Sequence, residues 1–424
     1  MHSNRRRRQP FIRLQRSPRR PAHLFNRRGN RNNRIHEPRY PPRILPIAAL
    51  WHSLKPRVFE KAVRSTKGYE QNMGHLFKPA VGTRIGFSHS LSSFVIVGAP
   101  NVDWRAVAWS PTLNLFCAVG QDVVAGNAVM TSPDGIVWTQ RNTAPVNVVQ
   151  AWRDIVWADA LGLFVAVGIA GDRLMTSPNG INWTAQIPAD PNDWLAIAWS
   201  PELGLLCAVS NNGTAANSVM TSPNGINWTR RASFAGGVNL WNGIAWAPEL
   251  TTFAAVGGAG GVGPGGGLER VMTSINGINW FIREIPIGTA GPTLSCVAWS
   301  PKLNLFAAFG NGAAGITDGI RTSLDGISWT IRNWPVGVIE GWNQIAWSPD
   351  QEMFAVVGGG GVLPIAKRVL TSINGIDWFL NISNINTATD NEWSGIAWSP
   401  ALALFAMVAT SAGSTNFAGT LVAP

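Results

Sequence analysis

One nine-residue turn recurs six times in this chain, and it constrains the fold more than any other feature. The stretch TSPNGINWT appears twice, and four close variants share its spacing. The copies begin at Thr131, Thr176, Thr221, Thr273, Thr322 and Thr371. The tryptophans of the first and last copies, Trp138 and Trp378, lie 240 residues apart in five steps, so the mean period is 48. A period of this length indicates an array of one small structural unit per repeat.

A second motif, of the form AVAWSPTLNLFCAVG, accompanies the turn and occurs seven times. Its tryptophans are Trp109, Trp157, Trp199, Trp246, Trp299, Trp347 and Trp398. Short apolar runs separated by glycine-rich breaks predict one four-stranded antiparallel sheet per repeat. In the first repeat we expect strands at 104–109, 115–120, 127–132 and 137–141. The seven copies therefore predict an all-β, seven-bladed β-propeller over residues 90–424.

The seventh repeat stops before its turn motif and lacks a fourth strand. The missing strand is expected at the other end of the chain, because FVIVGAPNVDWRAVAWS, from Phe94, aligns with a fourth strand followed by the next first strand. Phe94–Val97 should therefore pair with the C-terminal strand and close the ring. Closure removes the open sheet edges that otherwise favour aggregation.

The turn resembles the Asp-box, S/T-x-D-x-G-x-x-W, of sialidase-like (BNR) propellers, and the resemblance covers residues 90–424. The third box position holds Asp134, Asn179, Asn224, Asn276, Asp325 and Asn374. We expect this side chain to hydrogen-bond its own backbone, the glycine to adopt a positive φ and the tryptophan to pack between blades. Asp and Asn both occur at this position, and each box offers at most one carboxylate. The box therefore indicates a structural turn rather than a metal-binding loop.

The chain is also similar to the propellers of photosystem II assembly factors and of phage and large-virus virion proteins. Those resemblances imply an interaction factor or virion component that is not an enzyme. Sialidases use a tyrosine nucleophile, but both tyrosines, Tyr40 and Tyr69, and all six histidines precede residue 90. A glycan-processing enzyme with an unrecognised carboxylate pair remains the alternative. The three cysteines form no CxxC, so no metal site and no cofactor are expected.

Connection lengths distinguish the two faces of the predicted propeller. The first–second and third–fourth strand turns are uniform, whereas the loops between second and third strands vary, which predicts a protein- or glycan-binding face on the variable side. Candidate ligand-binding residues there are Trp104, Trp152, Trp194, Trp241, Trp342 and Trp393, with Thr293 in the fifth repeat, and the loop cations Arg270 and Arg368. The tryptophans start the first strands and would be aromatic platforms. Packing between blades is the alternative, and it is the role that this residue type favours.

The first 46 residues form a basic arm with twelve arginines before Glu37. Residues 1–100 hold 21 Lys and Arg against three acids, whereas the remainder holds 13 against 20. Such a composition predicts disorder. Polyanion-binding candidates are Arg5, Arg6, Arg7, Arg8, Arg19, Arg20, Arg27 and Arg28. The arm could bind nucleic acid or another polyanion, serve as an organelle transit peptide, or be a solvated tail.

Residues 47–89 are expected to be a linker that could form a short helix over 57–71. The arm lacks the apolar segment of a secretory signal, and no apolar run approaches the roughly 20 residues of a membrane-spanning helix. The sequence does not indicate the cellular compartment of the protein.

Overall fold

The computed structural model describes residues 93–122, 126–142, 150–212, 214, 216–233, 238–260, 269–286, 293–310, 318–335, 341–359, 369–381, 392–410 and 416–422. These residues belong to the second of the two units into which the chain divides, residues 85–424. The predicted arm, the linker with its short helix, and Arg368 lie outside the described residues. No helix within the described ranges has the length and apolarity of a membrane span.

Each sequence repeat forms consecutive antiparallel strands. The first repeats contain β2 (Asp103–Ser110), β3 (Leu115–Asp122), β4 (Val129–Ser132) and β5 (Thr139–Arg141); β6 (Gln150–Ala158), β7 (Leu163–Gly168), β8 (Leu174–Ser177) and β9 (Thr184–Ala185); and β10 (Trp194–Ser200), β11 (Leu205–Ser210), β12 (Val219–Ser222) and β13 (Thr229–Arg231). A short 3-10 helix, η2 (Asp159–Leu161), connects β6 and β7. The strands predicted for the first repeat agree with β2 to β5 to within two residues.

The later repeats follow the same order. They contain β14 (Val238–Ala247), β15 (Thr252–Gly260), β16 (Glu269–Ser274) and β17 (Phe281–Arg283); β18 (Leu294–Ser300), β19 (Leu305–Gly310), β20 (Ile320–Ser323) and β21 (Thr330–Arg332); β22 (Gly341–Ser348), β23 (Met353–Gly359), β24 (Val369–Ser372) and β25 (Phe379–Leu380); and β26 (Glu392–Ser399), β27 (Leu404–Thr410) and β28 (Asn416–Val422). The prediction of an all-β fold is confirmed for the residues that the structure describes.

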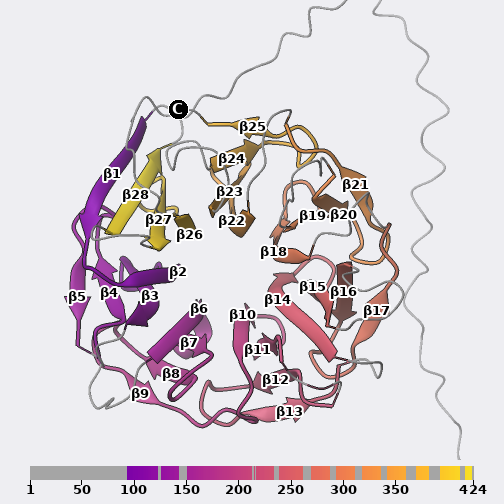
Figure 1. Cartoon of the computed structure of the whole chain (residues 1–424), viewed down its shortest axis with the longest axis horizontal. Coiled ribbons are helices and arrows are strands. Elements are labelled where there is room, and N and C mark those ends of the chain that lie inside the picture. Colours follow the sequence, from indigo (N-terminus) through magenta and orange to yellow (C-terminus); the bar gives the residue numbers. More distant parts are fainter. Residues whose placement is uncertain are drawn as a thin grey trace, which may run out of the picture. The chain divides into compact units, whose positions relative to one another are not determined.

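The sheets stand around a common centre, with the first strand of each repeat innermost (Figure 1). Most sheets have four strands, while β2–β5 and β6–β9 join into one eight-stranded sheet through the pairs Gln121↔Ala151 and Asp122↔Gln150. The sheet of β26, β27 and β28 takes its fourth strand from the start of the described chain: β1 (Ser93–Ala99) pairs antiparallel with β28. The seven pairs run from Ser93↔Val422 to Ala99↔Asn416.

The repeated turn has the predicted geometry. Asn179 Oδ1 accepts hydrogen bonds from the backbone N–H groups of Ile181 at 2.9 Å and Asn182 at 2.8 Å. Gly180 has a φ of +71°, which a side chain would strain. The indole of Trp183 donates to the Gly180 carbonyl at 3.1 Å, and its ring belongs to a buried cluster that includes Val119 of the preceding repeat. Asp and Asn side chains therefore make the same turn, because only one acceptor oxygen is needed.

The core lies between neighbouring repeats rather than within a single repeat. Each buried cluster combines residues of two successive repeats; one unites Cys117 and Val119 of β3 with Ile155 of β6 and Phe164 of β7. The three cysteines, Cys117, Cys207 and Cys296, are free and buried in this core. Burial raises the pKa of Cys296 to about 12, so its thiol stays protonated at neutral pH.

Candidate functional site

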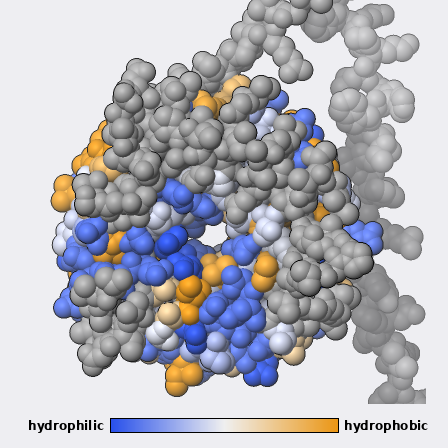
Figure 2. All heavy atoms as spheres, viewed as in Figure 1, coloured by the Kyte–Doolittle hydropathy of each residue, from blue (hydrophilic) through white to orange (hydrophobic). Residues whose placement is uncertain are grey.

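A pocket with a volume of about 200 Å³ lies at the centre, lined by the innermost strands. Each of these strands has a one-residue irregularity just after its first residues, for example between Trp104 and Ala106 in β2 and between Trp152 and Asp154 in β6. Such a bulge redirects a side chain. The residues at the bulge are Arg105, Arg153, Leu195, Asn242, Ser295, Asn343 and Ser394, and all of them line the pocket. Figure 2 shows hydrophilic residues beside the central opening on the side of β2.

Four of the bulge residues bond to the next repeat. Asn242 Nδ2 donates to the carbonyl of Leu294 at 3.0 Å, and Asn343 Nδ2 donates to that of Trp393 at 2.8 Å. The Ser394 hydroxyl donates to the carbonyl of Trp104 at 2.6 Å, and the Ser295 hydroxyl donates to that of Trp342. These side chains link neighbouring inner strands, and their polar groups are therefore used by the fold.

Asp154 and Gln344 occupy the next position along β6 and β22. Asp154 Oδ2 accepts from the N–H of Ile197 at 2.9 Å, and Gln344 Oε1 accepts from the N–H of Ile396 at 2.8 Å. Gln344 Nε2 also reaches Asp154 Oδ1 at 3.5 Å, from the opposite side of the centre (Figure 1). The two side chains span the pocket and join four inner strands.

Burial raises the pKa of Asp154 to about 7, although the N–H groups of Ile197 and Ile155 act in the opposite direction. Asp154 as a whole residue is partly exposed, and it lines the pocket between neighbouring strands. Near neutral pH it is therefore present in both protonation states. Below it, the following position of each inner strand is aliphatic and at most 9% exposed: Val107, Ile155, Ile197, Ile244, Val297, Ile345 and Ile396. The bulge residues form the polar mouth of the pocket, and five of these aliphatic residues, Ile155, Ile197, Ile244, Val297 and Ile345, line its floor.

Arg105 and Arg153 are also polar, but unlike the four bulge residues above they make no hydrogen bond to the next repeat within the described ranges. Arg153 Nη2 donates to Gln121 Oε1 at 3.2 Å, whereas Arg153 Nη1 and Arg105 Nε are buried and have no partner among the described residues. Burial and the positive charge of Arg105 lower the pKa of Arg153 to about 10, while Asp193 and Asp103 oppose that shift. The guanidinium group of Arg153 therefore remains charged at neutral pH.

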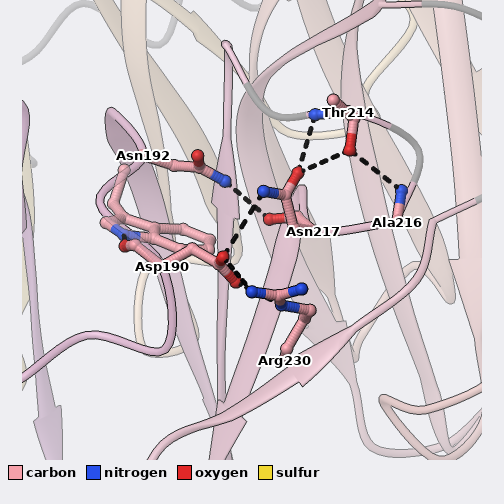
Figure 3. A network of polar contacts seen from close by, with 7 residues as sticks. Asp190, Asn192, Thr214, Ala216, Asn217 and Arg230 are labelled. Atoms are coloured by element: carbon pink, nitrogen blue, oxygen red, sulfur yellow. Dashed lines mark hydrogen bonds and ion pairs between the residues drawn. The ribbon is translucent and has the colours of Figure 1, made fainter. Parts of the chain in front are cut away.

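A second polar arrangement joins two loops that precede β10 and β12 (Figure 3). Asp190 is 6% exposed and accepts hydrogen bonds from Arg230 Nε at 2.7 Å and Arg230 Nη2 at 2.5 Å. Asn217 Nδ2 approaches Asp190 Oδ1 at 3.5 Å, and Asn192 Nδ2 donates to the carbonyl of Asn217 at 2.6 Å. Asn217 Oδ1 in turn accepts from the backbone N–H and hydroxyl of Thr214 at 2.7 and 2.8 Å. The loops are thereby held together by side chains.

The expectation of exposed aromatic platforms was wrong. Each predicted tryptophan is at most 1% exposed: Trp104, Trp152, Trp194, Trp241, Trp342 and Trp393. Their rings lie between neighbouring sheets; Trp104, for example, packs with Val408 and Ala418 of the last repeat. No ring face is left for a ligand, so the alternative of packing between blades is the correct one.

The fifth repeat also needs a correction. Its equivalent residue is Leu294 rather than Thr293, because Leu294 pairs with Gly310 as Trp104 pairs with Gly120. Leu294 is fully buried, so the predicted gap in the tryptophan ring is filled by a core side chain. Counting five residues back from Trp299, as in the other repeats, identifies this position from the sequence alone.

The other predicted cation, Arg270, lies in β16 opposite Gly257 rather than in a loop. Arg105 and Arg153 were not predicted as site residues. The available signal was the Trp-Arg dipeptide in the first two repeats, where every later repeat has an uncharged residue after the same position.

No protein-family model matches this chain, and no curated protein matches it. Solved structures do. YCF48 from Cyanidioschyzon merolae is 13% identical, with a TM-score of 0.53 over 78% of this chain and 99% of that chain. The beta-propeller domain of Cps50 (Swd1) from Myceliophteria thermophila is 10% identical, with a TM-score of 0.51 over 77% of this chain and 99% of that chain. A chain from a structure of the mitotic checkpoint complex is 15% identical, with a TM-score of 0.50 over 84% of this chain and 100% of that chain. At these identities the likeness shows the fold alone, and that fold is a β-propeller.

Proposed function

We propose that this protein is a non-enzymatic recognition scaffold. In this proposal the sheets are the blades of one seven-bladed propeller of the Asp-box type, closed by β1, and a protein or glycan partner binds the face that carries the variable loops. The basic arm anchors the protein to a polyanion or larger assembly, for which the resemblance to virion propellers favours a virion.

The loop network around Asp190 is the observation that carries the proposal. Asp190 is almost completely buried, yet its partner Arg230 has a side chain that is 57% exposed. The network therefore orders the loops and leaves a polar, solvent-facing surface above them. Polar loops fixed in advance on a rigid frame lose little conformational entropy on binding, which is what recognition surfaces require.

Both the loop network and the mouth of the central pocket are on the same side of the propeller. Asp190 and Asn192 precede β10, and Arg105 and Arg153 are near the starts of β2 and β6. The first strands start on the same side because the repeats share one chain direction. A partner seated on the loops would therefore also reach the pocket mouth.

The alternative, a glycan-processing enzyme, draws on one observation. A carboxyl group with a pKa of about 7, such as Asp154, has the protonation behaviour of a general acid. However, Asp154 Oδ1 accepts from the N–H of Ile155 at 2.9 Å and Asp154 Oδ2 accepts from that of Ile197. Because both oxygens already hold inner strands in place, a scaffold role for Asp154 is favoured.

The test is to probe the full chain on a glycan array and, in parallel, with a panel of chromogenic glycosides. The proposal expects saturable glycan binding without turnover, or no glycan response at all if the partner is a protein. Hydrolysis above the blank, lost in Asp154→Asn but retained in Asp318→Asn, would contradict the proposal in favour of the enzyme.

A further inference from the structure

We propose that the mouth of the central pocket binds an oxyanion, a carboxylate or phosphate group, between the guanidinium groups of Arg105 and Arg153. This inference goes beyond the proposed function, because it assigns a ligand chemistry to a site that a scaffold does not need in order to fold or to bind through its loops.

The two arginines occupy equivalent places in neighbouring repeats. Each follows the first tryptophan of an inner strand and sits at its bulge, on β2 and β6, which pack against each other. Both line the same pocket. The backbone therefore directs two long cationic side chains into one space of about 200 Å³, which suits a small group rather than a folded domain.

One N–H-bearing nitrogen on each arginine is not used by the fold. In β14, β18, β22 and β26 the equivalent side chain donates to the next inner strand, so this position is normally used for linking repeats. Arg105 Nε and Arg153 Nη1 instead are buried and lack a partner among the residues that the structure describes. A buried N–H group without an acceptor is unfavourable, and an oxyanion in the pocket would satisfy both.

The neighbouring carboxylates do not occupy the two unpartnered N–H groups, so an anion can bind there. Asp193 lies 3.8 Å from Arg173 Nη2, so this carboxylate is shared with a third guanidinium. Asp154 directs both oxygens at backbone N–H groups. Asp103 and Asp193 also attract Arg153, and they moderate the repulsion between the two arginines without engaging the two unpartnered N–H groups.

Arginine suits this chemistry because its planar fork matches two oxygens of a carboxylate or phosphate. The third bulge residue, Leu195, and the floor residues Ile155 and Ile197 add an apolar wall. A carboxylate on a short aliphatic chain would place its charge at the arginines and its methylene groups on that wall. The group could come from a small molecule or from an acidic side chain of a partner.

The test is isothermal titration calorimetry of the full chain at one fixed salt concentration, with inorganic phosphate, glutarate and a capped hexaglutamate peptide as probes. The variants are Arg105→Met and Arg153→Met, which keep most of the apolar stem. The control is Lys302→Met, which removes one exposed positive charge that pairs with Glu352 on the other face. The control also corrects for anions that bind the basic arm.

We expect at least one probe to bind with one-to-one stoichiometry, each arginine variant to weaken that binding at least tenfold, and the control to leave it within twofold. A response to phosphate or glutarate assigns the site to a small molecule, whereas a response to the peptide alone assigns it to a partner side chain. Equal affinity in the wild-type protein and both arginine variants, or no saturable binding of any probe, overturns the proposal. Should a Met variant fail to fold, Arg105→Lys and Arg153→Lys keep the charge but lose the fork, and the same tenfold loss is expected.

Discussion

The indole of Trp246 donates a hydrogen bond to Glu202 Oε2 at 2.6 Å, from one repeat to the repeat before it. The same bond links Trp199 with Asp159, Trp299 with Glu249 and Trp398 with Asp350, at 2.7, 2.6 and 3.0 Å. The remaining indoles of this set, on Trp109, Trp157 and Trp347, are buried without a partner in the described parts of the chain. The corresponding turn positions hold Ala401, Thr112 and Lys302. An Asp or Glu side chain in the turn thus determines whether this hydrogen bond links one repeat to the next.

Glu202→Ala should therefore lower the free energy of unfolding by about 1–2 kcal/mol, because it leaves the Trp246 indole unsatisfied. The complementary change, Ala401→Glu, should raise it by about 0.5–1.5 kcal/mol by giving the Trp109 indole an acceptor. Denaturant midpoints measure both. If neither variant shifts the denaturant midpoint, the hydrogen bond between the acid and the indole does not contribute to stability.

Gly180→Val should destabilise the protein by about 1–3 kcal/mol. The residue has a φ of +71°, and a Cβ there would lie 3.3 Å from Thr131 Cγ2 and 3.4 Å from Leu115 Cδ2. Gly162 is the matched control, since it has a φ of +61° but no atom within 4 Å of a Cβ. Gly162→Val should cost less than Gly180→Val in thermal unfolding, and an equal cost would show that contact between repeats adds nothing to the backbone strain.

Asn179→Asp should be nearly neutral at pH 7, because Asp134 makes the same turn. Burial raises the pKa of Asp134, but hydrogen bonds from the N–H groups of Val137 and Ile136 outweigh that effect and leave the pKa below its ordinary value. An acid with a lowered pKa stabilises the fold above its unfolded pKa, and this stabilisation is lost as the pH falls through its folded pKa. The variant should therefore match the wild type at pH 7 and be less stable below pH of about 4. Loss of a ligand-binding signal at unchanged stability would instead show that the box has a direct binding role.

Asp154 should show the opposite pH dependence. Its folded pKa of about 7 lies above its unfolded value, so the folded state binds more protons and stability falls as the pH rises between about 4 and 7. The slope is at most about 1 kcal/mol per pH unit, since solvent in the pocket reduces it. Urea unfolding across this range should show a contribution in the wild type that Asp154→Asn lacks. Identical slopes would mean that Asp154 titrates as in the unfolded chain.

Affinity of the full chain for DNA or heparin should fall steeply with salt and disappear when residues 1–46 are removed. The reason is that arginines of the arm release counterions from the polyanion on binding. Filter binding at several sodium chloride concentrations gives the slope. Binding that is independent of salt, or that survives the truncation, would remove the polyanion role from the arm.

The strands and turns could be predicted because their signals are local. The alternation of apolar residues marks each strand, and the Asn179–Gly180 pair specifies its turn within a few residues. The exposure of Trp104 could not be predicted in this way, because a tryptophan at the start of a strand suits both a platform and an interface between sheets. The structure distinguishes the two roles, because Trp104 belongs to a buried cluster with Val408 and Ala418. Arg105 was missed for a related reason, since the bulge interrupts the strand alternation that would indicate its direction.

The loop face and the central pocket exist only if the ring is closed, so closure is the claim on which the account depends. The pairing of β1 with β28, from Ser93↔Val422 to Ala99↔Asn416, is the contact that would close the ring. The most direct measurement is thermal unfolding of two truncated chains, one lacking residues 1–46 and one lacking residues 1–100. The account predicts a melting temperature close to that of the full chain for the first, and unfolding or aggregation for the second. Equal melting temperatures for the two truncations would contradict it.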